Sequence, residues 1–81
     1  DENLDLTVKE FEILYLLASH PKKVFSRTEL IDRIWYDDDY ISDRVIDVHV
    51  SAIRTKVGKE WIKTLRNAGY KFNKKAGEQP T

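Results

Sequence analysis

The stretch from residue 44 to residue 57 constrains the fold most, because its apolar residues repeat with the period of an α-helix. Four of them have the spacing of a core-facing stripe: Ile46, Val50, Ile53 and Val57. At about 100° per residue, the opposite side of the helix falls to other positions. They are Arg44, Val48, Ser51 and Thr55, with Val45 and Ala52 at the edge. Because an apolar stripe must be covered, other elements have to pack against one side of this helix.

The outward side of this helix has an unusual composition. It has no acidic residue, and it carries one cation, two hydroxyl side chains and small apolar groups. A solvated face would usually mix long side chains of both charges. Small side chains let a helix approach another surface closely, and methyl and hydroxyl groups suit the thymine methyls and base edges of a DNA major groove. We therefore interpret residues 44–57 as a recognition helix.

Size and composition restrict what this helix can belong to. The 81 residues allow one small domain, and 41% hydrophobic with 35% charged residues are typical of a folded chain. No apolar run approaches the roughly 20 residues of a membrane span, and no signal peptide is apparent. The absence of cysteine excludes a disulfide scaffold and a thiolate metal site. We therefore expect a cytoplasmic protein that contacts no membrane and holds no cofactor.

The formal net charge of zero conceals a strong segregation of charge. Residues 1–43 contain five Lys or Arg and eleven Asp or Glu, a net charge of −6. Residues 44–75 contain nine Lys or Arg and two Asp or Glu, a net charge of +7. Such clustering is typical of a protein that binds a phosphate backbone, although chance segregation in a small charged domain is the alternative.

Two capping boxes predict two helices before residue 44. Thr7 and Glu10 begin the first, which ends near Ser19, and Ser26 and Glu29 begin the second. The first helix is expected to turn one apolar face to the core: Phe11, Leu14, Leu17 and Ala18, widened by Ile13, Tyr15 and Leu16. The second helix ends near residue 35 or 36 and is expected to turn inward Leu30, Ile31, Ile34 and Trp35.

After the third helix, the pattern predicts a β-hairpin. Its strands are expected at residues 61–65 and 70–73, and the turn at 66–69 includes a glycine available for a positive φ. The turn offers Arg66, whose guanidinium suits the negative potential of an A·T-rich minor groove. Another short strand is expected at residues 3–6, and it needs partners because a lone strand is unstable.

An acidic loop with a net charge of −4 lies at residues 37–43. It lacks the alternating ligands, central glycine and distal glutamate of a calcium loop, so we expect no metal there and interpret it as a protein-contact loop. Nearby, Asp47 is expected to pair with Arg27 of the second helix. His49 is expected to be packed or solvated, because a metal site needs several ligands.

Three helices followed by a β-hairpin make a winged helix-turn-helix of the α+β class. Several separated motifs between residues 4 and 72 carry a resemblance. They are Leu6-Thr7, Glu10-Phe11 and Leu14; Ser26-Arg27, Leu30 and Trp35; Arg44 to Val50, Ile53-Arg54 and Lys56-Val57-Gly58; and Ile62, Thr64-Leu65-Arg66 and Gly69-Tyr70-Lys71-Phe72. Together they resemble the effector domain of OmpR/PhoB-type response regulators. The resemblance implies the C-terminal winged-helix DNA-binding domain of a bacterial two-component transcription factor.

The resemblance also implies functional residues and partners. Its DNA-binding positions are Arg44, Val45, Val48, Ser51, Ala52, Arg54, Thr55, Lys56, Thr64, Arg66 and Tyr70. It puts the recognition helix in the major groove, with Arg44 on a phosphate and Arg66 in the minor groove. The acidic loop is implied to contact RNA polymerase through Asp37, Asp38, Asp39 and Tyr40. The implied target is double-stranded DNA with direct-repeat half-sites, bound by a chain that is a monomer alone and a dimer on DNA.

By the same resemblance the chain has three parts. Residues 1–7 are the remnant of an N-terminal sheet, 8–73 form the winged-helix domain, and 74–81 are a flexible tail. The receiver domain of such regulators needs a full domain's length and is absent from this chain. Asn67 stands where the family usually has glycine, and asparagine tolerates the left-handed region that such a turn requires.

Other positions also depart from the family pattern. Many members have threonine where Val45 stands and arginines where Ser51 and Ala52 stand, so contact with thymine methyls is favoured over guanine readout. The alternative to DNA binding is a winged-helix protein–protein interaction module. An enzyme is not expected, because the sequence has no glycine-rich phosphate loop, no nucleophile with a base and no convincing carboxylate pair.

Overall fold

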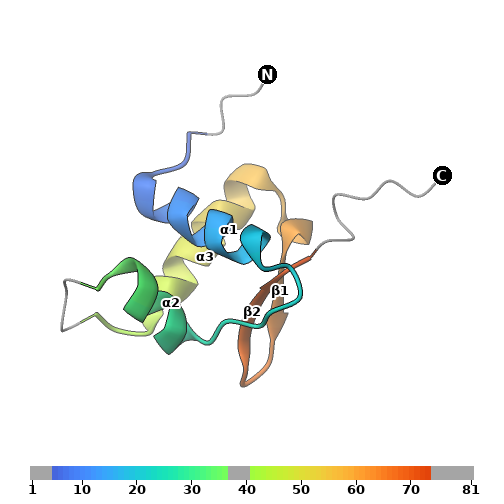
Figure 1. Ribbon diagram of the computed structural model, residues 1–81. Coiled ribbons are helices and arrows are strands. Elements are labelled where there is room, and N and C mark those ends of the chain that lie inside the picture. The colour runs from blue at the N-terminus through green and yellow to red at the C-terminus, as the bar shows by residue number, and fades with distance from the viewer. Residues whose placement is uncertain (1–4, 37–40, 74–81) are drawn as a thin grey trace.

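The computed structural model describes residues 5–36 and 41–73. The elements are α1 (Val8–Ser19), α2 (Arg27–Ile34), α3 (Arg44–Val57), the 3₁₀ turn η1 (Lys59–Trp61), β1 (Ile62–Leu65) and β2 (Gly69–Phe72). In Figure 1, α1 crosses in front of α3, α2 lies beside them, and the hairpin closes the other end. This order confirms the predicted α+β winged helix-turn-helix. The predicted tail at 74–81 and the contact residues Asp37, Asp38, Asp39 and Tyr40 lie outside the described residues.

Both predicted capping boxes are formed. The Thr7 hydroxyl accepts from the Glu10 backbone N–H at 3.2 Å, and the Glu10 carboxylate accepts from the Thr7 N–H at 3.0 Å. The equivalent bonds between Ser26 and Glu29 measure 3.0 and 3.1 Å. Each box satisfies two backbone donors that a helix start leaves without partners, so local sequence fixes where α1 and α2 begin.

The core forms where the three helices meet the hairpin. Its buried apolar members are Ile13, Leu17, Phe25, Leu30, Ile34, Ile46, Val50, Ile53, Ile62 and Tyr70. Three of the four residues of the predicted α3 stripe are fully buried, and Val57 is half-buried against the same cluster. The stripe therefore orients α3 as predicted, with its opposite side free.

The prediction of which α1 residues face the core was wrong in part. Phe11 and Tyr15 are 55% and 64% exposed, and Ala18 is also exposed, whereas Ile13 and Leu17 are buried. The rings of Phe11 and Tyr15 stack on each other outside the core, with centroids 5.9 Å apart. The reason is that α1 is apolar around nearly its whole circumference, so periodicity does not select one side. Packing against α3 and β2 selects it instead.

A third extended segment stabilises the hairpin. β1 and β2 pair antiparallel, and Phe25 adds an isolated bridge to Tyr70, with backbone N–H···O bonds of 2.8 and 2.9 Å. Gly69 has φ +135°, and a Cβ there would lie 2.0 Å from the Phe25 carbonyl oxygen. Glycine is therefore required at this crossing, and Asn67 adopts φ 65° in the turn, as its tolerance of the left-handed region predicted.

The N-terminal strand prediction was wrong where it can be followed. Residues 5 and 6 are not in a strand, and Asp5 has a positive φ of 58°. A strand needs a hydrogen-bonded neighbour, and the sheet of the described residues contains β1 and β2 alone. Among the described helices, none is long and apolar enough to cross a lipid bilayer.

Candidate nucleic-acid interface

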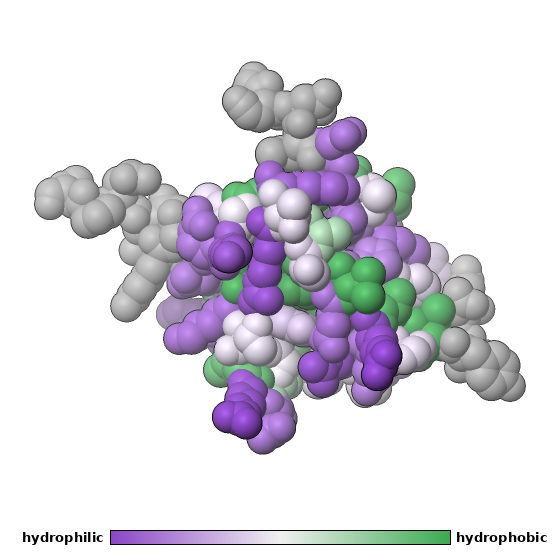
Figure 2. All heavy atoms as spheres, turned by 180° about the vertical axis from the view of Figure 1, so that it is seen from behind, coloured by the Kyte–Doolittle hydropathy of each residue, from purple (hydrophilic) through white to green (hydrophobic). Residues whose placement is uncertain are grey.

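The outward side of α3 presents the predicted groove-facing residues to solvent. Arg44, Ser51 and Thr55 are exposed and Val48 is 64% exposed, while Val45 and Ala52 are half-buried along one edge. The Thr55 hydroxyl donates to the Ser51 backbone carbonyl at 3.1 Å, which keeps the Thr55 side chain close to the helix. Figure 2 shows the molecule from behind, where hydrophilic side chains cover much of the face and hydrophobic ones gather in a band right of centre.

One flank of α3 is bonded to both α2 and the hairpin through Asp47. The carboxylate Oδ1 accepts from Arg27 Nε at 2.8 Å and from the Tyr70 hydroxyl at 2.6 Å. The first contact confirms the predicted Asp47–Arg27 pair. These two donors, the tyrosine first, hold the pKa of the Asp47 carboxyl below its ordinary value. Burial, reinforced by the bond to Asp47, raises the pKa of the Tyr70 phenol.

Arg54 makes a second link two turns farther along the same flank. Its Nη2 donates to the Ile62 carbonyl and to the Thr64 hydroxyl, both at 2.8 Å. The guanidinium carbon lies 5.7 Å from the centroid of the Tyr70 ring. Arg54, Thr64 and Tyr70, which were predicted to contact DNA, are thus brought together where α3 meets the hairpin.

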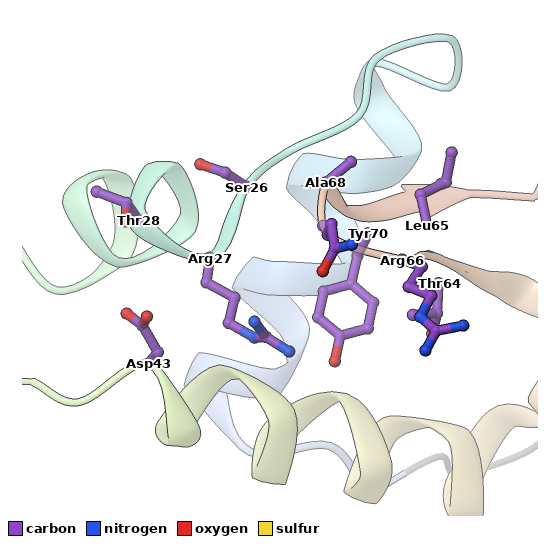
Figure 3. A pocket seen from close by; sticks show the side chains of 11 residues that line it. Ser26, Arg27, Thr28, Asp43, Thr64, Leu65, Arg66, Ala68 and Tyr70 are labelled. Atoms are coloured by element: carbon purple, nitrogen blue, oxygen red, sulfur yellow. The ribbon is translucent and has the colours of Figure 1, made fainter.

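Arg66 lies at the tip of the hairpin and is exposed. With Arg27 and Tyr70 it lines a cleft of about 530 Å³ between the start of α2, the start of α3 and the hairpin tip. Figure 3 shows Arg27, Tyr70 and Arg66 directing their polar ends to the same side, toward α3. The cleft therefore brings two guanidinium groups, those of Arg27 and Arg66, to the side of the cleft that faces α3.

Lys56 lies on the other flank and contacts α1. Its ammonium is 2.7 Å from Glu10 Oε1 and donates to the Asp5 carbonyl at 3.2 Å. Glu10 is buried, and its pKa lies below the ordinary value because Lys56 and the Thr7 backbone N–H donate to it. The helical position of Lys56 is about 100° from the centre of the groove-facing side. Lys56 thus has intramolecular partners on α1 and before it, and its side chain is partly exposed beside α3.

The histidine on that flank is packed, as predicted. The His49 ring meets the Trp35 ring edge-on, with centroids 5.2 Å apart, and Nδ1 is 2.8 Å from the Val45 carbonyl oxygen. Within residues 5–36 and 41–73, no group of three or more potential ligands is arranged to hold a metal ion.

Two cations near this surface were not predicted as part of it. Arg27 was predicted only as a partner of Asp47, yet its guanidinium also lines the cleft beside Arg66. Lys59 joins Ser51, Arg54 and Thr55 around a hollow of about 350 Å³ at the end of α3. The only sequence signal for Lys59 was the excess of cations after residue 44.

The sequence of residues 1–72 matches the family described as "Transcriptional regulatory protein, C terminal". The chain belongs to this family. Membership confirms the resemblance to OmpR/PhoB-type effector domains, and the family consists of transcriptional regulators rather than enzymes.

Individual members of this family align over most of the chain. The uncharacterized transcriptional regulatory protein YclJ of Bacillus subtilis (strain 168) is 39% identical over 72 residues, which are 85% of this chain and 32% of YclJ. The chain spans about a third of the length of such curated relatives, 32–36%.

Solved domains of the family share the fold. The crystal structure of the DNA-binding domain of Bacillus subtilis CssR superposes with a TM-score of 0.78 at 32% identity, covering 85% of this chain and 78% of that one. The DNA-binding domain of Klebsiella pneumoniae RstA, crystallised in complex with the RstA box, superposes with a TM-score of 0.73 at 33% identity, covering 88% and 75%.

Proposed function

We propose that this domain binds double-stranded DNA with sequence specificity, as the effector domain of a bacterial response regulator that controls transcription. The observation that carries the proposal is the acid-free, exposed side of α3 with the exposed Arg66 beside it. The complex of the related RstA domain with its DNA box supports it.

In the proposed complex, α3 lies in the major groove. Arg44 at its start contacts a phosphate, because a guanidinium pairs well with phosphate oxygens. The groove-facing side discriminates bases through Val45, Val48, Ser51, Ala52 and Thr55. Their methyl and hydroxyl groups favour thymine methyls and base edges over a bidentate guanine contact. Arg66 enters the adjacent minor groove, where negative potential attracts it.

The flank residues Arg54, Thr64 and Tyr70 are proposed to lie near the phosphates between the two grooves. Lys56 is proposed to lie near a phosphate on the opposite flank, where its ammonium is also bonded to Glu10. Lys59 is included as a phosphate contact, because it is exposed at the end of α3 beside Thr55.

One module of this kind buries on the order of 600–1,000 Å², so a single copy is expected to bind modestly. We propose that two copies occupy direct-repeat half-sites, which raises affinity through effective concentration. The acidic loop at 37–43 is proposed to contact RNA polymerase, because its charge keeps it away from DNA.

The proposal can be tested by selecting bound duplexes from a random library with this chain. The dissociation constant for the enriched duplex is then measured against salt concentration, for the wild type and for Arg44→Ala and Arg66→Ala. Each substitution should weaken binding, and Arg44→Ala should also reduce the salt slope by about 0.9 for its lost phosphate contact. Lys22→Ala is the matched control, because it removes one exposed cation from the turn between α1 and α2.

Enrichment of no sequence, or salt slopes that stay the same in both arginine variants, would refute DNA binding through this surface. The second result would favour the alternative, a winged-helix protein–protein interaction module.

A further inference from the structure

We propose that Asp47 is a positioning residue for DNA binding, which fixes the hairpin relative to α3 so that Arg66 and the groove-facing side engage one duplex together. The proposal rests on the proposed function, and it concerns a residue that faces neither groove. Asp47 is the only acidic residue within Arg44–Val57, the helix proposed to approach DNA.

One oxygen atom of Asp47 joins three elements. Asp47 lies on α3, and its Oδ1 accepts a hydrogen bond from Arg27 Nε of α2 at 2.8 Å and another from the Tyr70 hydroxyl of β2 at 2.6 Å. Tyr70 is only 6% exposed, so its ring is fixed in the core and its hydroxyl has a defined direction. A carboxylate beside a polyanion is electrostatically unfavourable, and an intramolecular role for Asp47 accounts for its presence here.

Arg54 makes the connection rigid. It follows Asp47 by two helical turns, a rise of about 10 Å, and donates to the Ile62 carbonyl and the Thr64 hydroxyl of β1. A single link would let the hairpin rotate, whereas two separate links on one flank hold both of its strands. A two-stranded hairpin is only marginally stable alone, so its orientation depends on such contacts.

Fixing the hairpin affects binding through preorganisation. When Arg66 is held at a set distance from α3, its entry into the minor groove costs little additional ordering. When the link is lost, Arg66 moves independently, and its contribution to the affinity of the recognition helix declines. The effects of substitutions at Asp47 and Arg66 should therefore be strongly non-additive.

The test is a double-mutant cycle on the duplex selected above. Asp47→Ala should weaken binding, although it removes a negative charge near DNA, and the weakening caused by Arg66→Ala should be at least about threefold smaller in that background. Asp47→Asn retains an acceptor oxygen at the same place, so it should preserve most of the coupling. Asp32→Ala, at an exposed position on α2, is the control for charge removal and should leave the effect of Arg66→Ala unchanged.

Circular dichroism at the binding temperature establishes that each variant is folded. Tyr70→Phe, which removes only the hydroxyl that bonds to Asp47, gives a second measurement of the same coupling. The positioning role would be overturned if Asp47→Ala bound DNA more tightly than the wild type. It would also be overturned if Arg66→Ala weakened binding as much in the Asp47→Ala and Tyr70→Phe backgrounds as in the wild type. If the wild type bound no duplex, the proposed function would fail along with it.

Discussion

Replacing Gly69 by alanine adds only a methyl group, but it should destabilise the domain strongly. The added Cβ would lie 2.0 Å from the Phe25 carbonyl oxygen, which is backbone and has little freedom to move away. Separating the two segments breaks both backbone hydrogen bonds between Phe25 and Tyr70, each worth about 1 kcal/mol. The positive φ of residue 69 adds about 1–2 kcal/mol for a residue with a side chain. The expected loss is about 3–4 kcal/mol, a large part of the roughly 5–15 kcal/mol that stabilise a typical domain.

Gly58→Ala is the matched control. Gly58 also has a positive φ, +115°, but its added Cβ would meet the carboxylate of Glu60, the end of a flexible side chain. Only the backbone strain of about 1–2 kcal/mol should then be lost. Urea unfolding followed by circular dichroism gives both free energies, provided the m-values agree. If Gly69→Ala were no more destabilising than Gly58→Ala, that result would contradict the close approach of the Phe25 backbone to Gly69.

Three further substitutions test the core, an ion pair and the groove-facing side. Ile13→Ala should cost about 2–5 kcal/mol in unfolding free energy, whereas Phe11→Ala, at an exposed position, should cost about 1 kcal/mol or less; equal losses in urea unfolding would contradict the burial of α1. Glu10→Gln keeps the capping box but loses the ion pair with Lys56. The pKa of Glu10 in the folded state is below its ordinary 4.5, so the extra stability of the wild type over Glu10→Gln should be present above pH 4.5. In thermal melts this difference in stability should decline as the pH falls below 4.5, and a difference that is independent of pH would refute the ion pair's contribution. Val48→Glu should change stability by about 0.5 kcal/mol or less but strongly weaken DNA binding in anisotropy titrations, and unchanged binding would remove Val48 from the interface.

The sequence predicted the parts of the fold that depend on local chemistry. Side chains three residues apart form the capping boxes of α1 and α2, so their geometry is encoded within one helical turn. The stripe of α3 was readable because charged and polar residues separate its apolar positions. The pairing of Asp47 with Arg27 of the second helix was also predicted correctly, from the position of Asp47 on a flank of α3 that borders the core.

The sequence did not predict the parts that depend on distant partners. The burial of Ile13 instead of Phe11 follows from packing against α3 and β2, and α1 itself offers apolar residues on both sides. The bridge between Phe25 and Tyr70 joins residues whose separation in sequence carries no local signal. The bond between Lys56 and Glu10 likewise joins residues 46 positions apart, so no local pattern predicts it.

The most direct test of the account is a map of which residues contact DNA. The backbone amides of the ¹⁵N-labelled chain would be followed by NMR while the selected duplex is added. If α3 and the hairpin bind DNA as proposed, the largest shift changes occur at Arg44, Val48, Ser51 and Thr55 and at the hairpin tip around Arg66. Changes confined to the exposed α1 side, around Phe11 and Tyr15, would contradict it.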